Sequence, residues 1–243
     1  MKYILKFTKK SLLKLITYFI RLIKYKYFDL QNMSQSKASF FDWDWNKINF
    51  NRIALVNLLV SKSKNSSYLE IGCATNSLFD SIPLVKKIGV DPASGGTIRK
   101  TSDDFFKSNK LKFDVIFIDG LHTYEQVRRD IINSIKFLNK SGFICIHDML
   151  PRNWAESHPA NITTGAWLGD VWKVAFELIE TDYIDFKILK IDYGIGIIKV
   201  TNPRAELKDF HSQLEDKNFS YFFSNIKKIP IIEWNDAQDW LKI

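Results

Sequence analysis

The feature that most constrains the fold of this chain is a series of short apolar runs, each of which stops at a polar residue or a glycine. Four of them follow one another along the sequence: Ser67–Ile71, Lys87–Val90, Phe113–Ile118 and Phe143–Ile146. Such runs are typical of parallel strands that are buried on both faces of a sheet. Because helical patterns alternate with the runs, we predict right-handed β–α–β crossovers and a doubly wound sheet.

The clearest helical pattern lies between the third and fourth runs. Apolar residues recur there every three or four positions, at Val127, Ile131, Ile135 and Leu138. Thr123 and Gln126 have the spacing of a capping box, which predicts that the helix starts at this point. Shorter helices are predicted over Ile53–Leu59 and near Val171–Glu180.

Two further strand-like runs, Phe186–Ile191 and Ile195–Val200, are close enough in sequence to pair as an antiparallel hairpin. The predicted fold class is therefore α/β, with a Rossmann-like, mostly parallel sheet that ends in an antiparallel C-terminal hairpin. We assign this domain to residues 51–203. Residues 29–50 are expected to form a linker, and residues 204–243 form a C-terminal extension to which the sequence gives no role.

The positive charge of the chain is concentrated at its N-terminus. The formal net charge is +8, and residues 1–28 hold no acidic residue but eight basic ones: Lys2, Lys6, Lys9, Lys10, Lys14, Arg21, Lys24 and Lys26. Removing these eight from the 35 basic residues leaves 27, which equals the number of acidic residues. The remainder is formally neutral, which argues against a nucleic-acid partner, because phosphate backbones are bound by a basic face of the domain itself.

Residues 1–28 are also predicted to contain a basic amphipathic helix. One face would carry Leu12, Ile16, Phe19, Ile20 and Ile23, and the opposite face Lys10, Lys14, Thr17, Arg21 and Lys24. Charges interrupt the apolar stretch well before the ~20 residues that a membrane span needs, and no signal-peptide cleavage site follows. Two interpretations remain open: a helix lying in an anionic membrane surface, or a helix packed on the main domain or on a partner subunit.

The only two cysteines, Cys73 and Cys145, lie in or beside predicted strands. This placement indicates reduced, buried thiols and excludes both a disulfide framework and a cysteine metal cluster. We therefore expect a cytoplasmic protein, and the basic helix leaves open a peripheral position at the inner membrane face. The oligomeric state is not indicated.

In open α/β sheets, ligands bind beyond the carboxyl ends of the strands. The first run is followed by a tight turn that contains Gly72 and Ala74, with Glu70 before it and Asn76 and Ser77 opening a predicted helix. This loop departs from G-x-G-x-x-G, which disfavours a nicotinamide-dependent oxidoreductase, the main rival enzyme class.

Three later loops carry the polar side chains that matter most. Asp91 ends the second run and is placed to accept hydrogen bonds from ribose hydroxyls, although it could equally cap a turn. A capped helix start contains Ser102 and Asp103, where an adenine ring could lie. The last group comes from the loops after two neighbouring strands and consists of Asp119, His122, His147 and Asp148. Because titratable groups are costly to bury without purpose, we predict that these four form the reaction centre.

These segments resemble the class I S-adenosylmethionine-dependent methyltransferases, and most of all methyltransferase domain family 24, whose bacterial members often accompany sugar and polysaccharide biosynthesis. The resemblance covers residues 65–200 and rests on six segments in order: L-E-I-G-C, G-V-D-P, T-S-D-D-F-F, F-I-D-G-L-H-T-Y-E-Q-V, H-D-M-L-P and G-D-V-W-K. One departure is that Ala74 and Asn76 stand where the family has a second glycine.

The resemblance implies S-adenosylmethionine as the cofactor. The residues expected to bind it are Glu70, Gly72, Cys73, Ala74, Ser77, Asp91, Ser102, Asp103 and Asp119, the last beneath the sulfonium. Related sugar and catechol O-methyltransferases hold a divalent ion at comparable places, which implies Asp119 and Asp148 as ligands of Mg²⁺.

The expected reaction is methyl transfer to a hydroxyl oxygen, with Asp119, His122 and His147 as catalytic residues and one of the histidines as the base. By resemblance the acceptor is a sugar hydroxyl of a polysaccharide or a lipid-linked precursor, and a small phenol is the second choice. A catalytically silent, membrane-associated binding protein is the alternative outside enzymes, and it leaves the two Asp–His pairs without a role.

Overall fold

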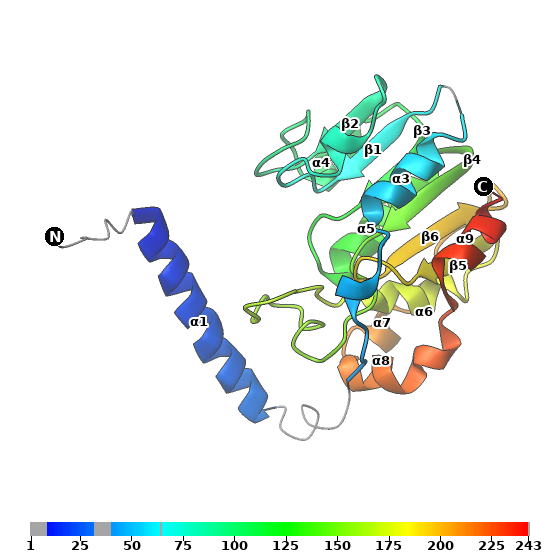
Figure 1. Ribbon diagram of the computed structural model, residues 1–243. Coiled ribbons are helices and arrows are strands. Elements are labelled where there is room, and N and C mark those ends of the chain that lie inside the picture. The colour runs from blue at the N-terminus through cyan, green and yellow to red at the C-terminus, as the bar shows by residue number, and fades with distance from the viewer. Residues whose placement is uncertain (1–8, 32–39, 64, 243) are drawn as a thin grey trace.

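The computed structural model describes residues 9–31, 40–63 and 65–242, and they contain a seven-stranded sheet with the order β2-β1-β3-β4-β6-β5-β7 (Figure 1). The strands are β1 (Tyr68–Ile71), β2 (Lys87–Val90), β3 (Phe113–Ile118), β4 (Leu138–Ile146), β5 (Ile184–Leu189), β6 (Ile195–Val200) and β7 (Ile231–Ile232). Strands β1 to β4 are parallel, and β6 pairs antiparallel with both β4 and β5. The predicted fold class, including the C-terminal hairpin, is confirmed.

Helices cover both faces of this sheet. They are α3 (Arg52–Val60), α4 (Ser102–Ser108), α5 (Tyr124–Phe137), α6 (Val174–Leu178), α7 (His211–Leu214), α8 (Phe219–Asn225) and α9 (Trp234–Leu241), whereas α1 (Lys9–Gln31) lies apart from the sheet (Figure 1). Short 3₁₀ turns are η1 (Trp45–Lys47), η2 (Phe79–Ser81), η3 (Val171–Lys173) and η4 (Ile226–Lys228). Alternate strand residues enter separate apolar cores: Ile116 and Ile144 pack with α5 and α6, whereas Val115 and Cys145 pack with α3 and α9. Both cysteines are buried and free.

One predicted helix start was wrong, and the predicted helix start at Thr123 was right but lacks its predicted cap. No α-helix begins at Asn76 and Ser77, and only η2 follows, because Asn76 has a left-handed backbone (φ 64°) and its side chain accepts a hydrogen bond from the backbone N–H of Gly96. The capping box of α5 is also absent, since the Thr123 side chain makes no capping hydrogen bond. The cap comes instead from Asp170, whose carboxylate accepts the Tyr124 N–H at 2.8 Å.

The segments on either side of the predicted domain pack onto it. Phe41 and Trp43 stack with 4.2 Å between their ring centroids, and Phe41 also contacts Phe223, 4.8 Å away. At the other end of the chain, β7 pairs with β5, and Leu241 is buried beside α3. The folded unit therefore extends beyond the predicted limits of 51–203 in both directions.

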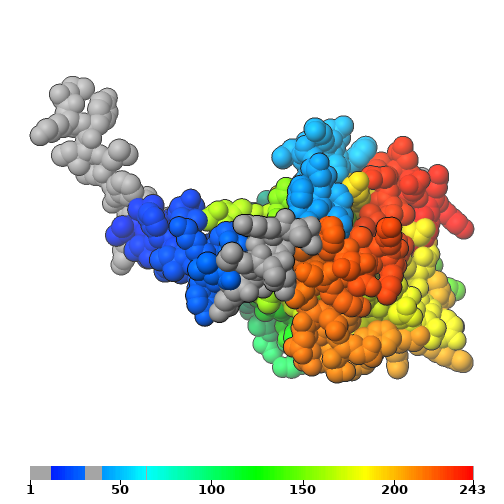
Figure 2. Space-filling model, turned by 90° about the horizontal axis from the view of Figure 1, so that it is seen from below, coloured from blue at the N-terminus to red at the C-terminus, as the bar shows by residue number. Residues whose placement is uncertain are grey.

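Helix α1 projects from the body of the domain (Figures 1 and 2). It reaches Gln31, slightly beyond the segment in which an amphipathic helix was expected, and residues 1–8 and the linker residues 32–39 lie outside the described part of the chain. No helix in the described part is sufficiently long and apolar to cross a membrane.

If the C-terminal segment is part of the domain, Leu241→Ala will lower the free energy of unfolding by about 2–5 kcal/mol, because it leaves a cavity in a packed core. Leu111→Ala is the matched control: Leu111 is 56% exposed, and its loss is expected to change stability by less than about 0.5 kcal/mol. Urea denaturation of the two variants measures the difference. Equal, small effects would show that α9 does not pack on the sheet.

Candidate active site

A cleft of about 990 Å³ lies at the carboxyl ends of β1 to β4, the edge at which the sequence predicted a binding site. Eleven of the predicted site residues line it: Glu70, Gly72, Cys73, Ala74, Ser77, Asp91, Ser102, Asp119, His122, His147 and Asp148. Asp103 is not among the lining residues. Its side chain lies instead within 3.5 Å of Arg129 on α5.

The floor of the cleft depends on a close approach between two loops. Gly72 has φ +85°, and a Cβ atom at this position would overlap the backbone oxygen of Asp119. Glycine is therefore required here for both its backbone conformation and its lack of a side chain. Ala74 also has a left-handed backbone, with φ 47°, so the departure from a second glycine is accommodated with some strain.

Asp91 organises the loops on either side of it. One carboxylate oxygen accepts the N–H groups of Cys73 and Ala74, each at 3.0 Å, and the other accepts those of Ala93 and Ser94 at 2.7 and 2.8 Å. Burial raises the pKa of Asp91, but these four donors more than offset it, so the pKa lies below its ordinary value. Asp91 thus has the turn-capping role that the sequence left open, and ribose hydroxyls would have to share its oxygens.

Glu70 is a buried carboxyl group on the cleft wall. Its carboxylate accepts a hydrogen bond from the Tyr68 hydroxyl at 2.5 Å. Burial raises the pKa of Glu70 to about 7, against the lowering effect of Tyr68. The group is therefore close to half-ionised at neutral pH and responsive to a nearby positive charge.

A second buried carboxyl group, Asp130 on α5, lies at the end of the cleft near Ser102. The Gln126 amide donates to the Ser102 hydroxyl at 3.0 Å and to one Asp130 oxygen at 3.1 Å, while the other Asp130 oxygen has no hydrogen-bond partner among the described residues. Burial raises the pKa of Asp130 to about 6. Asp130 was not predicted as a site residue, because its position on a helix does not indicate that it faces the cleft.

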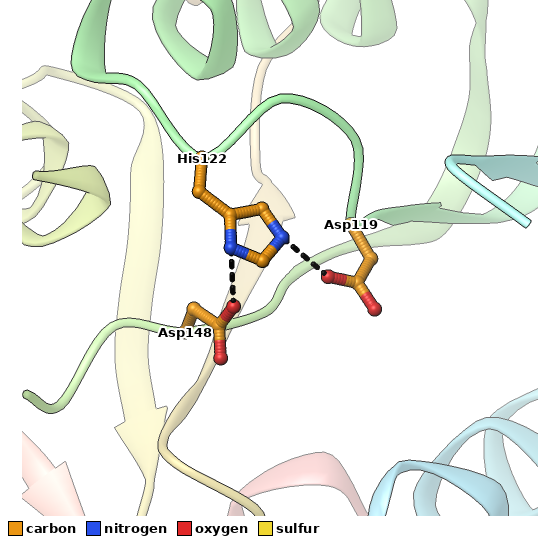
Figure 3. Close-up of side chains that lie close together, drawn as sticks. All are labelled: Asp119, His122 and Asp148. Atoms are coloured by element: carbon orange, nitrogen blue, oxygen red, sulfur yellow. Dashed lines mark ion pairs between the residues drawn. The ribbon is translucent and has the colours of Figure 1, made fainter. Parts of the chain in front are cut away.

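At the other end of the cleft, the imidazole of His122 lies between two carboxylates (Figure 3). Its Nδ1 is 3.0 Å from Asp148, and its Nε2 is 3.3 Å from Asp119. His147 is deeper, and its Nδ1 lies 3.0 Å from Asp148 and 3.3 Å from Asp119, at ion-pair distance but without hydrogen-bond geometry. The structure thus brings together all four residues predicted for the reaction centre.

Two residues of this cluster were not predicted. Arg52, the first residue of α3, contacts Asp119 at 2.6 Å through Nη1 and Asp192 at 2.8 Å through Nε. Asp192 and Tyr193 form the β5–β6 turn, and both have left-handed backbones ahead of Gly194. Two strained residues in succession, aimed into a cleft, are a feature of functional sites. In the sequence, Asp192, Tyr193 and Gly194 lie between the two strand-like runs of the predicted hairpin, and nothing there indicated that they reach the cleft.

The cluster balances its buried charges. Burial opposes the charged forms, but neighbouring carboxylates raise the pKa of His122 to about 10 and raise that of His147 well above its usual range. Burial likewise raises the pKa values of Asp119, Asp148 and Asp192, but the cations beside them more than offset this, so all three lie below their ordinary values. With Arg52, three positive groups therefore face three negative ones.

The wall beside His122 is aromatic. The Trp167 ring stacks on the imidazole with 5.1 Å between centroids and 24° between planes, and its Nε1 donates to the backbone oxygen of His158 at 2.7 Å. Tyr193 lines the same cleft. Neither residue was predicted, because neither directly follows one of the four parallel strands. Trp167 lies in a long loop whose position the sequence does not specify.

Residues 85–149, from the start of the β2 region to the end of β4, match the family model of a methyltransferase domain. A comparison with curated protein sequences finds no match. Among solved structures, the chain is similar to a Bacillus cereus O-methyltransferase in complex with S-adenosylhomocysteine, with 12% identity over 81% of this chain and 93% of that one and a TM-score of 0.47.

It is also similar to the S-adenosylhomocysteine-bound methyltransferase PaMTH1 of Podospora anserina, with 15% identity over 83% of this chain and 100% of that one and a TM-score of 0.46. At such low sequence identity, neither structure indicates the acceptor of this chain. The domain match lies within a sheet that has the expected Rossmann-like class I topology, and it covers the strands that deliver Asp91, Asp119 and Asp148 to the cleft. The part of the chain that forms β2 to β4 and this edge of the cleft is thus similar to a methyltransferase domain.

Proposed function

We propose that this protein is an S-adenosylmethionine-dependent methyltransferase that acts on a hydroxyl oxygen, and that the acceptor is a sugar of a polysaccharide or lipid-linked precursor. The observation that carries the proposal is the division of one cleft into two ends. One end is built from backbone groups and small residues around Gly72 and Asp91, and the other from the histidines and carboxylates around Asp119. A nucleoside cofactor fits the first, and an alcohol that must lose a proton fits the second.

In this proposal the methionine and ribose parts of the cofactor lie along Glu70, Gly72, Cys73, Ala74 and Ser77, with Asp91 at the ribose. The adenine lies beside Ser102. Since Asp103 does not line the cleft, Gln126 and Asp130 take its place in the proposed adenine site. Asp130 has one unpartnered oxygen, and the adenine amino group is the kind of donor that a carboxylate in this position accepts.

Methyl transfer needs alignment and a place for one proton. The acceptor oxygen attacks the methyl carbon in line with the carbon–sulfur bond, the bonding electrons pass to sulfur, and S-adenosylhomocysteine is released. The hydroxyl proton passes to His122 or His147. Both imidazoles already hold a proton when their pKa values are raised by the carboxylates, so either can act as the base only after losing it.

A divalent cation would account for that loss. The ligand atoms of Asp119, His122 and Asp148 all lie within 4.8 Å of one another, and the two carboxylates could hold Mg²⁺ or Mn²⁺. If the His122 imidazole also binds the ion, which suits Mn²⁺ better than Mg²⁺, the base is His147. With both imidazoles neutral, the three carboxylates and Arg52 together carry two net negative charges. When bound, the ion would supply the balancing charge and lower the pKa of an acceptor hydroxyl.

The aromatic wall supports a ring-shaped acceptor. Trp167 and Tyr193 line a cleft that also holds several polar groups, and this combination suits a sugar, which has apolar ring faces and hydroxyl edges. A phenolic ring would stack on the same wall, and it remains the second acceptor class.

Calorimetric titration with S-adenosylhomocysteine tests the cofactor assignment. Binding is expected, and it should strengthen about tenfold from pH 6 to pH 8, because ionised Glu70, with a pKa of about 7, attracts the ammonium group of the ligand. Glu70→Gln should abolish this pH dependence, whereas Glu206→Gln, at an exposed position, should retain it. Absence of binding by the wild-type protein would overturn the cofactor assignment, and pH-independent binding would overturn the role of Glu70.

A transfer assay with labelled cofactor, Mg²⁺ and a panel of nucleotide sugars tests the base. His122→Ala or His147→Ala is expected to lower turnover by a factor of about 10²–10⁴, the usual contribution of a general base. His211→Ala, outside the cleft, is the matched control and should retain activity. Unchanged turnover in both cleft variants would exclude the base assignment, and activity confined to phenols would reject the sugar.

Proton release tests the cation site without any assay of turnover. Adding Mg²⁺ to the lightly buffered protein near pH 8 should release about two protons per site, because the cation replaces the two imidazolium charges. Asp148→Asn should lose this release, and Asp80→Asn, an exposed position on η2, should keep it. If the wild-type protein releases no protons with either Mg²⁺ or Mn²⁺, the proposed metal site is wrong.

A further inference from the structure

Helix α1 leaves an apolar stripe uncovered within the described part of the chain. We define this stripe as Leu12, Ile16, Phe19, Ile20, Ile23, Tyr27 and Leu30, all of which are exposed. Ile23 and Leu30, for example, keep 69% and 70% of their surface accessible. A continuous apolar surface of this kind marks a site of interaction, because exposing it to water is unfavourable.

The helix touches the domain with its other side. Tyr25 stacks on Trp154 with 5.5 Å between ring centroids, and the Phe28 ring lies 4.6 Å from that of His158. At 3.6 residues per turn, Tyr25 and Phe28 lie on the side of the helix opposite Ile16 and Ile23. The apolar stripe therefore points away from the domain, and the helix projects from the body, as Figure 2 shows.

The charge of the helix indicates what covers the stripe. Lys14, Arg21, Lys24 and Lys26 are spread along it, and no acidic residue occurs before Asp29. A second copy of the chain would bring the same positive charge to the contact and would be repelled. An anionic lipid surface offers both an apolar layer for the stripe and negative headgroups for the lysines.

We propose that α1 docks this methyltransferase on an anionic lipid bilayer. The helix lies in the plane of the surface with the apolar stripe in the acyl boundary. Lys24 and the other basic side chains extend toward the headgroups, as long basic side chains do at such interfaces. Each basic residue near the surface adds attraction that weakens as the salt concentration rises.

Docking through α1 would also bring the cleft close to the bilayer. Trp154 and His158, which α1 contacts, belong to the loop of residues 151–170, and Trp167 of the same loop stacks on His122. The bilayer would therefore lie next to the loop that forms the aromatic wall. This step rests on the proposed function, and it favours an acceptor carried on a lipid at the membrane surface over one free in solution.

The test is flotation of the full-length protein with vesicles. Phosphatidylcholine vesicles that contain about 30% phosphatidylglycerol should bind it at least about tenfold more strongly than pure phosphatidylcholine, and about 0.5 M salt should remove most of this difference. The double variant Phe19→Glu and Ile23→Glu should lose binding at least tenfold. Val85→Glu with Leu111→Glu makes the same chemical change at two exposed sites on the domain and should bind as the wild type does.

Equal binding of the wild-type protein to both kinds of vesicle, or full binding by the Phe19→Glu and Ile23→Glu variant, would overturn the proposal. It would also be overturned if light scattering showed a wild-type dimer that this variant dissociates, since a second copy would then cover the stripe. None of these measurements depends on the cleft. Titration of the variants with S-adenosylhomocysteine reports on the proposed function separately and confirms that they are folded.

Discussion

The buried charge balance at the carboxyl ends of β3 and β4 is the constraint on which the rest of the cleft depends. An isolated buried carboxylate costs several kcal/mol, so Asp119, Asp148 and Asp192 can stay ionised there only with positive partners. Those partners come from separate parts of the chain, with Arg52 on α3 and the two imidazoles in the loops after β3 and β4. The cluster therefore fixes where α3 and the β5–β6 turn meet the sheet.

The two ends of the cleft are built on different physical principles. At the proposed cofactor end, the backbone determines the geometry: Gly72 has no side chain to obstruct Asp119, and the carboxylate of Asp91 accepts four N–H groups. At the proposed acceptor end, the geometry is determined by side chains that meet across long stretches of sequence. The first arrangement suits a cofactor of constant shape, and the second can change with the acceptor while the sheet stays the same.

Much of the sheet could be predicted because its signals are local. The strands β2 and β3 have the bounds that their apolar runs gave, and the strand tips necessarily collect at one edge. The start of α5 was predicted at Thr123, but the group that caps it could not be, because this group is Asp170, which is remote in sequence. The same holds for the C-terminal segment: β7 is only two residues long, and its pairing with β5 leaves no periodic pattern to read.

The site residues, too, fall into those that local sequence signals predicted and those that they did not. Residues at strand ends, such as Glu70 and His147, were found because position along a strand determines which edge they reach. Arg52 and Asp130 were missed because each lies on a helix, where a charged residue is usually solvent-exposed, and Trp167 because a long loop has no periodicity. Asp103 was placed in the cleft by its neighbour Ser102, but successive helical residues point in different directions.

The Asp170 cap also has a consequence for the order in which the protein can fold. A nascent chain emerges from the ribosome with its N-terminal part first, so α5 exists for some time before the residue that caps it. The delay is longer for the ion pair between Arg52 and Asp192, since Asp192 follows Arg52 by 140 positions. The first half of the sheet is thus synthesised with an incomplete helix start and with an arginine that has only one of its two carboxylate partners, Asp119. It can reach its final state only after the β5–β6 turn has been added.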